Sequence, residues 1–204
     1  MNSVHFHPSG DFLLVGTDHF MIRVLDVKTS KSFTAIQPQD HHKSSINQVR
    51  YSNDAAFYVS CSWDGCIKIW DAVTNQCERV INNAHNGRNV TSVKISKTGK
   101  YILSAGADST VKLWDLGTGK QVSTFAKHTT VGDRCNVDFG HNEEYIVCVD
   151  EPSSAGVVYN TRSGELDQRL TGHNNVVRWI AASPVDPALI TCSDDHRARF
   201  WCTE

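Results

Sequence analysis

The strongest constraint on the fold is an internal repeat with a period of about 44 residues. The repeat is aligned on pairs that combine a large side chain with a small polar residue. These pairs are Leu25-Asp26, Trp70-Asp71, Trp114-Asp115, Tyr159-Asn160 and Trp201-Cys202. They are separated by 45, 44, 45 and 42 residues. A period of this length indicates small structural units that stack on one another, because one unit alone cannot bury its apolar face.

Four positions recur in register in three of the five copies. Each tryptophan follows an aspartate by six residues, a hydroxyl residue precedes that aspartate by four, and a histidine precedes it by 22 or 23. The three sets are His42, Ser60, Asp64 and Trp70; His85, Ser104, Asp108 and Trp114; and His173, Thr191, Asp195 and Trp201. A set that recurs in every complete copy is typical of a structural requirement of the repeat.

The segments between these positions carry strand patterns. Alternating runs such as "VTSVKIS" follow each histidine, apolar runs such as "KYILSAG" come next, and the tryptophan-terminated segments such as "TVKLW" follow. Turn residues separate the first two runs in each copy, as in "KTGK". No segment of about 10 residues or more carries a helical stripe, so we expect an all-β fold.

This combination resembles the WD-repeat family, in which a histidine near the start and a Trp-Asp pair at the end bound each repeat. The resemblance implies a WD40-type β-propeller of about five four-stranded antiparallel blades, a partial ring in the form of an open arc. The approximate blades are 1–37, 42–82, 85–126, 128–170 and 173–204, and the last blade is expected to lack its outer strand. The resemblance further implies that the four recurring side chains join in a hydrogen-bond chain within each blade. In "SCSWDGCIKIWDA", Trp70-Asp71 is then the signature pair and Trp63-Asp64 is fortuitous.

The alternative is that His42, Ser60 and Asp64 form a hydrolase triad. Recurrence argues against it, because an active site is needed once whereas every blade must be closed. The chain also lacks the G-x-S-x-G motif that positions a nucleophilic serine. We therefore expect no enzymatic activity and no catalytic residues.

A metal site and a cofactor site are also not expected. The histidine pairs His5/His7 and His41/His42 have no second ligand pair at the spacing of a zinc site. The glycines of "SAGADST" and "DLGTGK" match neither the phosphate-binding loop nor the dinucleotide-binding motif.

Two copies depart from the pattern. The first has Leu25 in place of tryptophan, and its Asp18 lies seven residues upstream. The fourth keeps His128, but Asp150 lies nine residues before Tyr159. We expect neither copy to form the same polar chain, and both to be less stable.

Candidate partner-binding positions lie in the turn that carries the aspartate. Trp63 immediately precedes this aspartate, and Ala107 and Asp194 occupy the same position in their copies. An aromatic residue there suits a partner anchor, although packing of Trp63 on its own turn is an equal alternative. Arg197 and Arg199 are, with Arg178, a candidate patch for an anionic partner, and solvated strand residues are the alternative.

At finer grain, "GHNNVVRWIAASPVDPALITCSDDHRARFW" resembles the C-terminal repeats of the WD-repeat subunits of cleavage stimulation factor, a nuclear complex for pre-mRNA 3′-end cleavage and polyadenylation. The resemblance implies a non-enzymatic scaffold in the nucleus whose partners are the factor's other protein subunits. It also implies that self-association uses a region absent from this chain, and that these repeats belong to a larger ring of about seven blades. A WD-repeat adaptor of another assembly, such as a ubiquitin-ligase substrate receptor, is the alternative.

Charge and hydropathy narrow the classes of partner. Lys and Arg number 20 against 22 Asp and Glu, so the formal charge is −2 and no broad positive field attracts a phosphate backbone. We therefore expect no direct nucleic-acid contact. No run of 18 apolar residues predicts a membrane span, and we expect no membrane partner.

Overall fold

The computed structural model describes residues 2–132 and 135–202, and these residues form five antiparallel sheets of consecutive strands. The strands, grouped by sheet, are β1 (Ser3–Phe6), β2 (Phe12–Gly16), β3 (Arg23–Asp26) and β4 (Ser32–Phe33); β5 (Ile46–Tyr51), β6 (Phe57–Ser62), β7 (Ile67–Asp71) and β8 (Cys77–Ile81); β9 (Val90–Ile95), β10 (Tyr101–Gly106), β11 (Thr110–Asp115) and β12 (Gln121–Phe125); β13 (Val137–Phe139), β14 (Tyr145–Asp150), β15 (Ala155–Asn160) and β16 (Leu166–Leu170); and β17 (Val177–Ala182), β18 (Ala188–Ser193) and β19 (Ala198–Cys202). The short 3-10 helix η1 (Pro38–Asp40) links the first two sheets. Within the described residues, no helix has the length and hydropathy needed to cross a bilayer.

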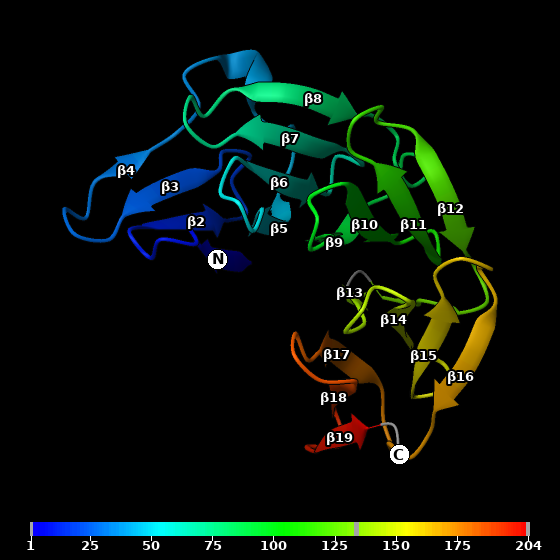
Figure 1. Cartoon of the computed structure of the whole chain (residues 1–204). Coiled ribbons are helices and arrows are strands. Elements are labelled where there is room, and N and C mark those ends of the chain that lie inside the picture. Colours follow the sequence, from blue (N-terminus) through cyan, green and yellow to red (C-terminus); the bar gives the residue numbers. More distant parts are fainter. Residues whose placement is uncertain (1, 133–134, 203–204) are drawn as a thin grey trace.

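The five sheets are arranged as blades along an open arc (Figure 1). The first strand of each sheet lies beside the first strand of the next, toward the centre of the arc, and the fourth strands lie at the rim. The arc does not close between the first and the last sheet (Figure 1). The expected all-β fold of four-stranded antiparallel blades in an open arc is therefore confirmed, with three described strands in the fifth sheet.

Large apolar side chains fill the spaces between the sheets. Leu14 and Ile22 of the first sheet pack with Val49 and Trp70 of the second. A second cluster joins the second sheet to the third, and a third cluster spans the third, fourth and fifth sheets. A sheet thus buries its apolar side chains mainly against its neighbours, as the period of the repeat indicated.

Polar contacts between first strands repeat with the same period. The amide oxygen of Gln48 accepts from the Ser92 hydroxyl at 3.0 Å and from the Val93 backbone N–H at 2.7 Å. Two sheets further on, the Asn136 side-chain oxygen accepts from the Ile180 backbone N–H at 3.4 Å. These bonds set the register between neighbouring blades, because each joins corresponding positions of the repeat.

The turn between the second and third strands of a blade needs a left-handed backbone. Gly65, Ser109 and His196, which directly follow the three recurring aspartates, have φ of +78°, +59° and +63°. Only Gly65 adopts this conformation without steric cost, and a Cβ there would approach the Gly87 and Arg88 backbone to 3.2 Å. The aspartate carboxylates stabilise the turn by accepting from the backbone N–H two residues on, as Asp64 does from Cys66 at 2.9 Å.

The burial of the signature tryptophans predicts their contribution to stability. Trp114 is only 6% exposed within the cluster between the second and third sheets. Replacing it with alanine (Trp114→Ala) should lower the free energy of unfolding by about 3–5 kcal/mol, because the large side chain leaves a cavity. Urea denaturation measures this loss. Trp179→Ala, at a tryptophan that is 45% exposed, is the matched control, with an expected change of about 0.5 kcal/mol. Equal losses in the two variants would contradict this account of the core.

Candidate functional site

The second sheet brings together the four side chains of the first complete set. The Trp70 indole N–H donates to Ser60 Oγ at 2.9 Å, and Ser60 Oγ lies 2.7 Å from His42 Nε2. His42 Nδ1 lies 2.8 Å from Asp64 Oδ2, which also accepts from the Lys43 backbone N–H at 2.9 Å. The chain runs from the third strand through the second to the loop before the first. It therefore ties three segments of one blade together.

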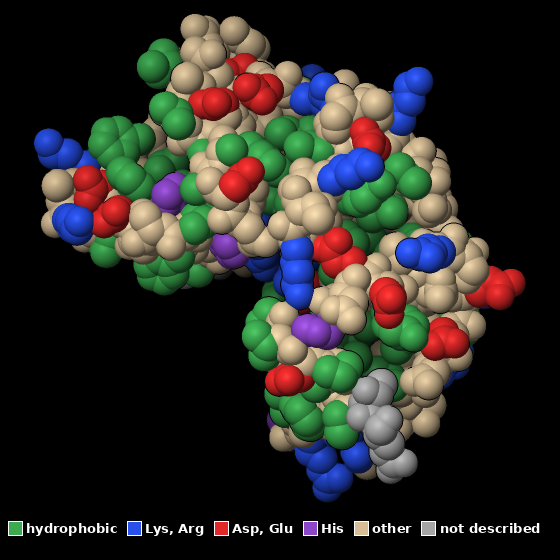
Figure 2. Space-filling view, in the orientation of Figure 1, with side chains coloured by type: hydrophobic (Ala, Val, Ile, Leu, Met, Phe, Trp, Pro, Cys, Tyr) green, Lys and Arg blue, Asp and Glu red, His purple; other side chains and the backbone are tan. Residues whose placement is uncertain are grey.

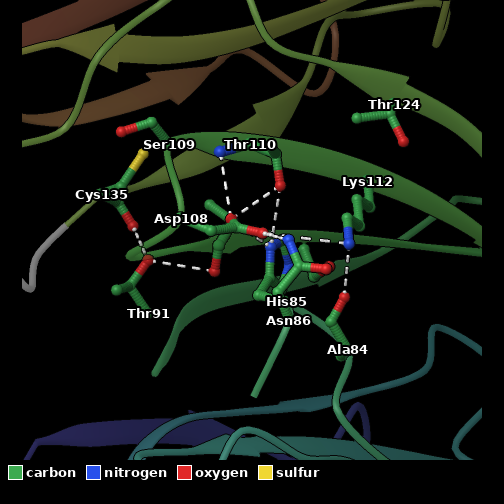
Figure 3. A network of polar contacts seen from close by, with 12 residues as sticks. Ala84, His85, Asn86, Thr91, Asp108, Ser109, Thr110, Lys112, Thr124 and Cys135 are labelled. Carbon is green, nitrogen blue, oxygen red and sulfur yellow. Dashed lines mark hydrogen bonds and ion pairs between the residues drawn. The ribbon is translucent and has the colours of Figure 1, made fainter. Parts of the chain in front are cut away.

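The third sheet repeats this geometry around His85 (Figure 3). His85 Nδ1 lies 2.8 Å from Asp108 Oδ1, and its Nε2 lies 2.8 Å from Ser104 Oγ. Ser104 Oγ accepts from the Trp114 indole N–H at 2.8 Å. The fit around His85 is close, because a Cβ on Gly106 would lie 2.2 Å from the imidazole.

The fifth sheet has the same chain with a threonine as the hydroxyl residue. His173 Nδ1 lies 2.9 Å from Asp195 Oδ2, and its Nε2 lies 2.8 Å from Thr191 Oγ1. The Trp201 indole N–H donates to Thr191 Oγ1 at 2.9 Å. All 12 residues singled out in the sequence thus meet within their own sheets.

Burial and neighbouring groups define the protonation states of His42 and Asp64 in the hydrogen-bond chain of the second sheet. Burial lowers the pKa of His42, which favours the neutral imidazole. Although burial alone would raise the pKa of Asp64, the hydrogen bond from His42 and the backbone N–H donors hold it well below its usual value. In a neutral ring, Nδ1–H donates to the carboxylate and Nε2 accepts from the serine hydroxyl. Every polar atom in the chain then has a partner.

In the second and third sheets, a lysine two positions before the tryptophan adds a further contact to the hydrogen-bond chain. Lys68 Nζ donates to the backbone oxygen of His41 at 2.8 Å and lies 5.9 Å from the centre of the Trp70 ring. Lys112 Nζ likewise donates to the backbone oxygen of Ala84 at 2.8 Å (Figure 3). In both sheets the accepting carbonyl belongs to the residue before the recurring histidine. This contact was not predicted from the sequence, although Lys68, Lys112 and Arg199 recur with the period of the repeat.

The fourth sheet builds a different polar chain from its own residues. His128 Nδ1 lies 2.9 Å from the Tyr159 hydroxyl, while Cys148 stands where the other sheets have a hydroxyl residue. Asp150 accepts from the Thr129 backbone N–H at 2.8 Å, as Asp64 does from Lys43. The expectation that this copy lacks the standard chain agrees with the geometry, but a substitute network takes its place.

The basic residue of the fourth sheet comes from another strand. Val157 occupies the position of Lys112 on the third strand, and its cross-strand partner on β16 is Arg169. Arg169 forms an ion pair with Asp150 and donates to the backbone oxygen of Lys127 at 3.1 Å. Lys127 directly precedes His128, so Arg169 contacts the carbonyl that corresponds to those held by Lys68 and Lys112. The fourth sheet therefore preserves this contact with a residue from a different strand.

The first sheet has no equivalent chain among the described residues. Leu25 and Val15 occupy the tryptophan and hydroxyl positions, and neither offers a hydrogen-bonding side chain. The Asp18 carboxylate accepts instead from the Asn2 side-chain amide at 2.9 Å.

The candidate partner-binding residues differ in exposure. Trp63 is 49% exposed, and the side chains of Asp194 and Arg197 are also exposed, whereas Ala107 is half-buried. Arg199 is half-buried and lies against Gly172. The Arg178 guanidinium is paired with the Asp194 carboxylate at 2.6 Å. Arg197 is thus the one of these three arginines that is exposed without a carboxylate partner among the described residues.

The pairs His5/His7 and His41/His42 belong to no metal-ligand set. In the described part of the chain, no group of three or more His, Cys, Asp or Glu side chains is arranged to hold a metal ion. His5 instead accepts from the Tyr51 backbone N–H at 3.2 Å. His7 lies 2.8 Å from the Ser9 hydroxyl.

Comparison with known families agrees with the repeated geometry. The family model described as WD domain, G-beta repeat, matches residues 33–71, 75–115 and 164–202, together more than half of the chain. The chain therefore belongs to the WD40 repeat family. The matched segments contain the three complete sets, and most of the fourth sheet lies outside them.

The chain is also similar to individual proteins over most of its length. The chain is 39% identical to cleavage stimulation factor subunit 50 of Arabidopsis thaliana over 203 residues, which cover 98% of this chain and 47% of the relative. It is 30% identical to a periodic tryptophan protein 2 homolog of Dictyostelium discoideum over 84% of this chain and 18% of the relative. The chain thus spans about half the length of the first of these relatives and less of the second.

The buried His128 predicts a loss of stability in acid. Burial lowers its pKa to about 4, whereas a histidine in the unfolded chain has its ordinary pKa of 6.5. The unfolded state therefore binds the proton first, so the stabilisation is complete above pH 6.5 and is lost as the pH falls toward 4. His128 should contribute about 3 kcal/mol to this loss. Urea denaturation between pH 7 and pH 4 should show a shallower decline for His128→Gln than for the natural protein. Parallel curves would contradict the assignment.

The substitute network in the fourth sheet predicts a role for Arg169. Replacing it with methionine (Arg169→Met) leaves the buried Asp150 carboxylate without its cation and should cost about 1–2 kcal/mol. The matched control is Arg162→Met, at an exposed arginine in the same sheet with no side-chain hydrogen bond in the described structure. Thermal unfolding should place the first variant well below the second. An equal melting temperature would show that Arg169 does not support the network.

Proposed function

We propose that the protein is a non-enzymatic WD-repeat scaffold that assembles with the other subunits of a cleavage stimulation factor in pre-mRNA 3′-end cleavage and polyadenylation. The observation that carries the proposal is the 39% identity to cleavage stimulation factor subunit 50, which extends over 98% of this chain. Similarity along all five sheets goes beyond the repeat motif, which needs only a few positions in each copy. The proposal places the protein in the nucleus, where this processing takes place.

A scaffold role without catalysis agrees with the burial of the polar chains. His42, Ser60 and Asp64 are connected as a serine hydrolase triad would be, but the Ser60 side chain is 0% exposed. Its oxygen already accepts from the Trp70 indole, so a substrate carbonyl has no access to it. The same arrangement occurs in three sheets, as a requirement of blade architecture would produce.

The two ends of the arc support a second part of the proposal, that these sheets belong to a larger ring. Ser3 and His5 face the second sheet, so strand alternation places Val4 and Phe6 on the opposite face, where they are 42% and 59% exposed. At the other end, the cross-strand pair Ile190 and Phe200 is 40% and 71% exposed. We infer that further blades cover these two apolar faces, because soluble proteins rarely leave such faces in water.

Trp63 is the anchor that we propose for a protein partner. Its indole is 49% exposed at the turn between β6 and β7. Phe20, in the corresponding turn of the first sheet, is 47% exposed, and the two turns are linked because Ser45 accepts from the Trp63 N–H and donates to the Asp18 oxygen. Two aromatic side chains on one end of neighbouring blades offer the kind of contact that dominates protein interfaces.

Co-purification from nuclear extract tests the function. The tagged protein should recover the subunits of the 3′-end processing machinery. Recovery of ubiquitin-ligase subunits in their place would contradict the proposal and favour an adaptor role.

The Trp63→Ala variant tests the partner surface. It should leave the melting temperature nearly unchanged and reduce recovery of the partner by about tenfold, the loss expected for an interface hot spot. Val73→Ala is the control, since Val73 is 89% exposed in the turn at the opposite end of β7. A large drop in melting temperature for Trp63→Ala would show that the indole packs on its own turn.

A further inference from the structure

A charged cavity lies at the centre of the arc, where the first strands of the five sheets converge. Its volume is about 390 Å³, and its lining includes residues of β1, β5, β9, β13 and β17. Figure 2 shows basic, acidic and histidine side chains close together in this central region. The cavity is separate from the buried polar chains described above, none of whose members lines it.

Four of the lining residues occupy one position of the repeat. His5, Arg50, Lys94 and Asp138 lie on successive first strands at spacings of 45, 44 and 44 residues. Because these strands are neighbours, the four side chains form a row at one level of the central surface. Lys97, in the turn after β9, adds a further cation to the lining.

The carboxylates of the cavity are already engaged. Asp138 Oδ2 accepts from Lys94 Nζ at 2.9 Å and from the Ala182 backbone N–H at 3.4 Å. The Glu143 carboxylate accepts from the Lys97 backbone N–H. Lys97 Nζ donates to the backbone oxygens of His141 and Pro184, at 2.6 and 2.9 Å.

Arg50 is left without a counter-ion. Its Nη1 donates to Ser3 Oγ at 3.1 Å and to the Val49 backbone oxygen at 2.7 Å. Among residues 2–132 and 135–202, no carboxylate forms an ion pair with this guanidinium, and its Nε and Nη2 have no protein acceptor. A desolvated cation without a counter-ion is costly, so the cavity favours a mobile anion beside Arg50.

We propose that this cavity binds an oxyanion, the phosphate or carboxylate group of a small molecule, on the Arg50 guanidinium. The free N–H groups of an arginine match two oxygens of such a group in a bidentate geometry. Lys97 and Lys94 add positive charge on the same side. Asp138 and Glu143, which accept from Lys94 and from the Lys97 backbone N–H, form no ion pair with Arg50 among the described residues. The inference is independent of the proposed role in 3′-end processing.

His5 supplies a reporter in the unaltered protein. Burial, and then the positive charges of Arg50 and Lys94, lower its pKa to about 4. An anion bound between these residues stabilises the protonated imidazole and should therefore raise the pKa of His5.

The test titrates the protein with pyrophosphate in one arm and with succinate in the other, at about 150 mM salt to screen weak surface binding. Calorimetry should show saturable binding in at least one arm, and the arm that binds identifies phosphate or carboxylate as the source. NMR of the histidine ring should show the His5 pKa rising with the same anion. No saturable binding in either arm, or binding with an unchanged His5 pKa, would overturn the proposal.

Substitutions locate the site. Arg50→Gln should weaken binding at least about tenfold, and Arg50→Lys should give an intermediate loss because it keeps the charge but not the fork. The matched control is Arg79→Gln, which removes an arginine that lies outside the cavity and donates to the backbone oxygens of Leu116 and Gly117 in the next blade. Equal weakening in Arg79→Gln and Arg50→Gln would reject the cavity as the site.

Discussion

In the three blades with a complete set, the polar chain starts from the bond between a tryptophan indole and a buried hydroxyl. In the second, third and fifth sheets it lies at 2.8–2.9 Å and connects the third strand to the second. The same hydroxyl is hydrogen-bonded to a histidine, and the histidine is hydrogen-bonded to an aspartate in the turn between the second and third strands. Each of these groups would be costly to bury alone. Bonded to one another, the four side chains of each set leave none of their polar atoms without a partner. The turn, the loop before the first strand and the tryptophan position are therefore specified together.

The fourth sheet keeps part of this arrangement without the tryptophan and the hydroxyl residue. It lacks the hydroxyl and the indole, yet His128, Asp150 and a cation still occupy the same end of the blade. Arg169 donates to the backbone oxygen of Lys127, the residue before the histidine. It does so from the fourth strand, β16, and not from the third strand, β15. Contact with that carbonyl and with the aspartate is thus kept while the residue that provides it changes strand. The motif that defines the family is one solution to a more general requirement for neutralising buried polar groups.

The sequence predicted the fold class and the members of each polar chain because both are periodic. His42, Ser60, Asp64 and Trp70 have counterparts at nearly the same intervals in two other copies, and strand alternation supports the same units. The Lys68 contact is also periodic, but its role depends on a backbone carbonyl that no sequence pattern displays. The Asp150–Arg169 pair was beyond prediction, because it relies on cross-strand register between β15 and β16. The lack of a counter-ion for Arg50 could not be predicted either, because the surroundings of this side chain form only where the first strands of five sheets converge.

The division of contacts within and between sheets also makes the stability of one blade depend on its neighbours. The histidine–aspartate chains lie inside single sheets, whereas the apolar clusters and the Gln48 and Asn136 bonds lie between them. Opening a seam exposes the apolar faces of both sheets, so a blade that is separated from its neighbours loses most of its stabilisation. Hydrogen exchange would then be slowest for amides at the middle of a blade and fastest in the connections that cross a seam.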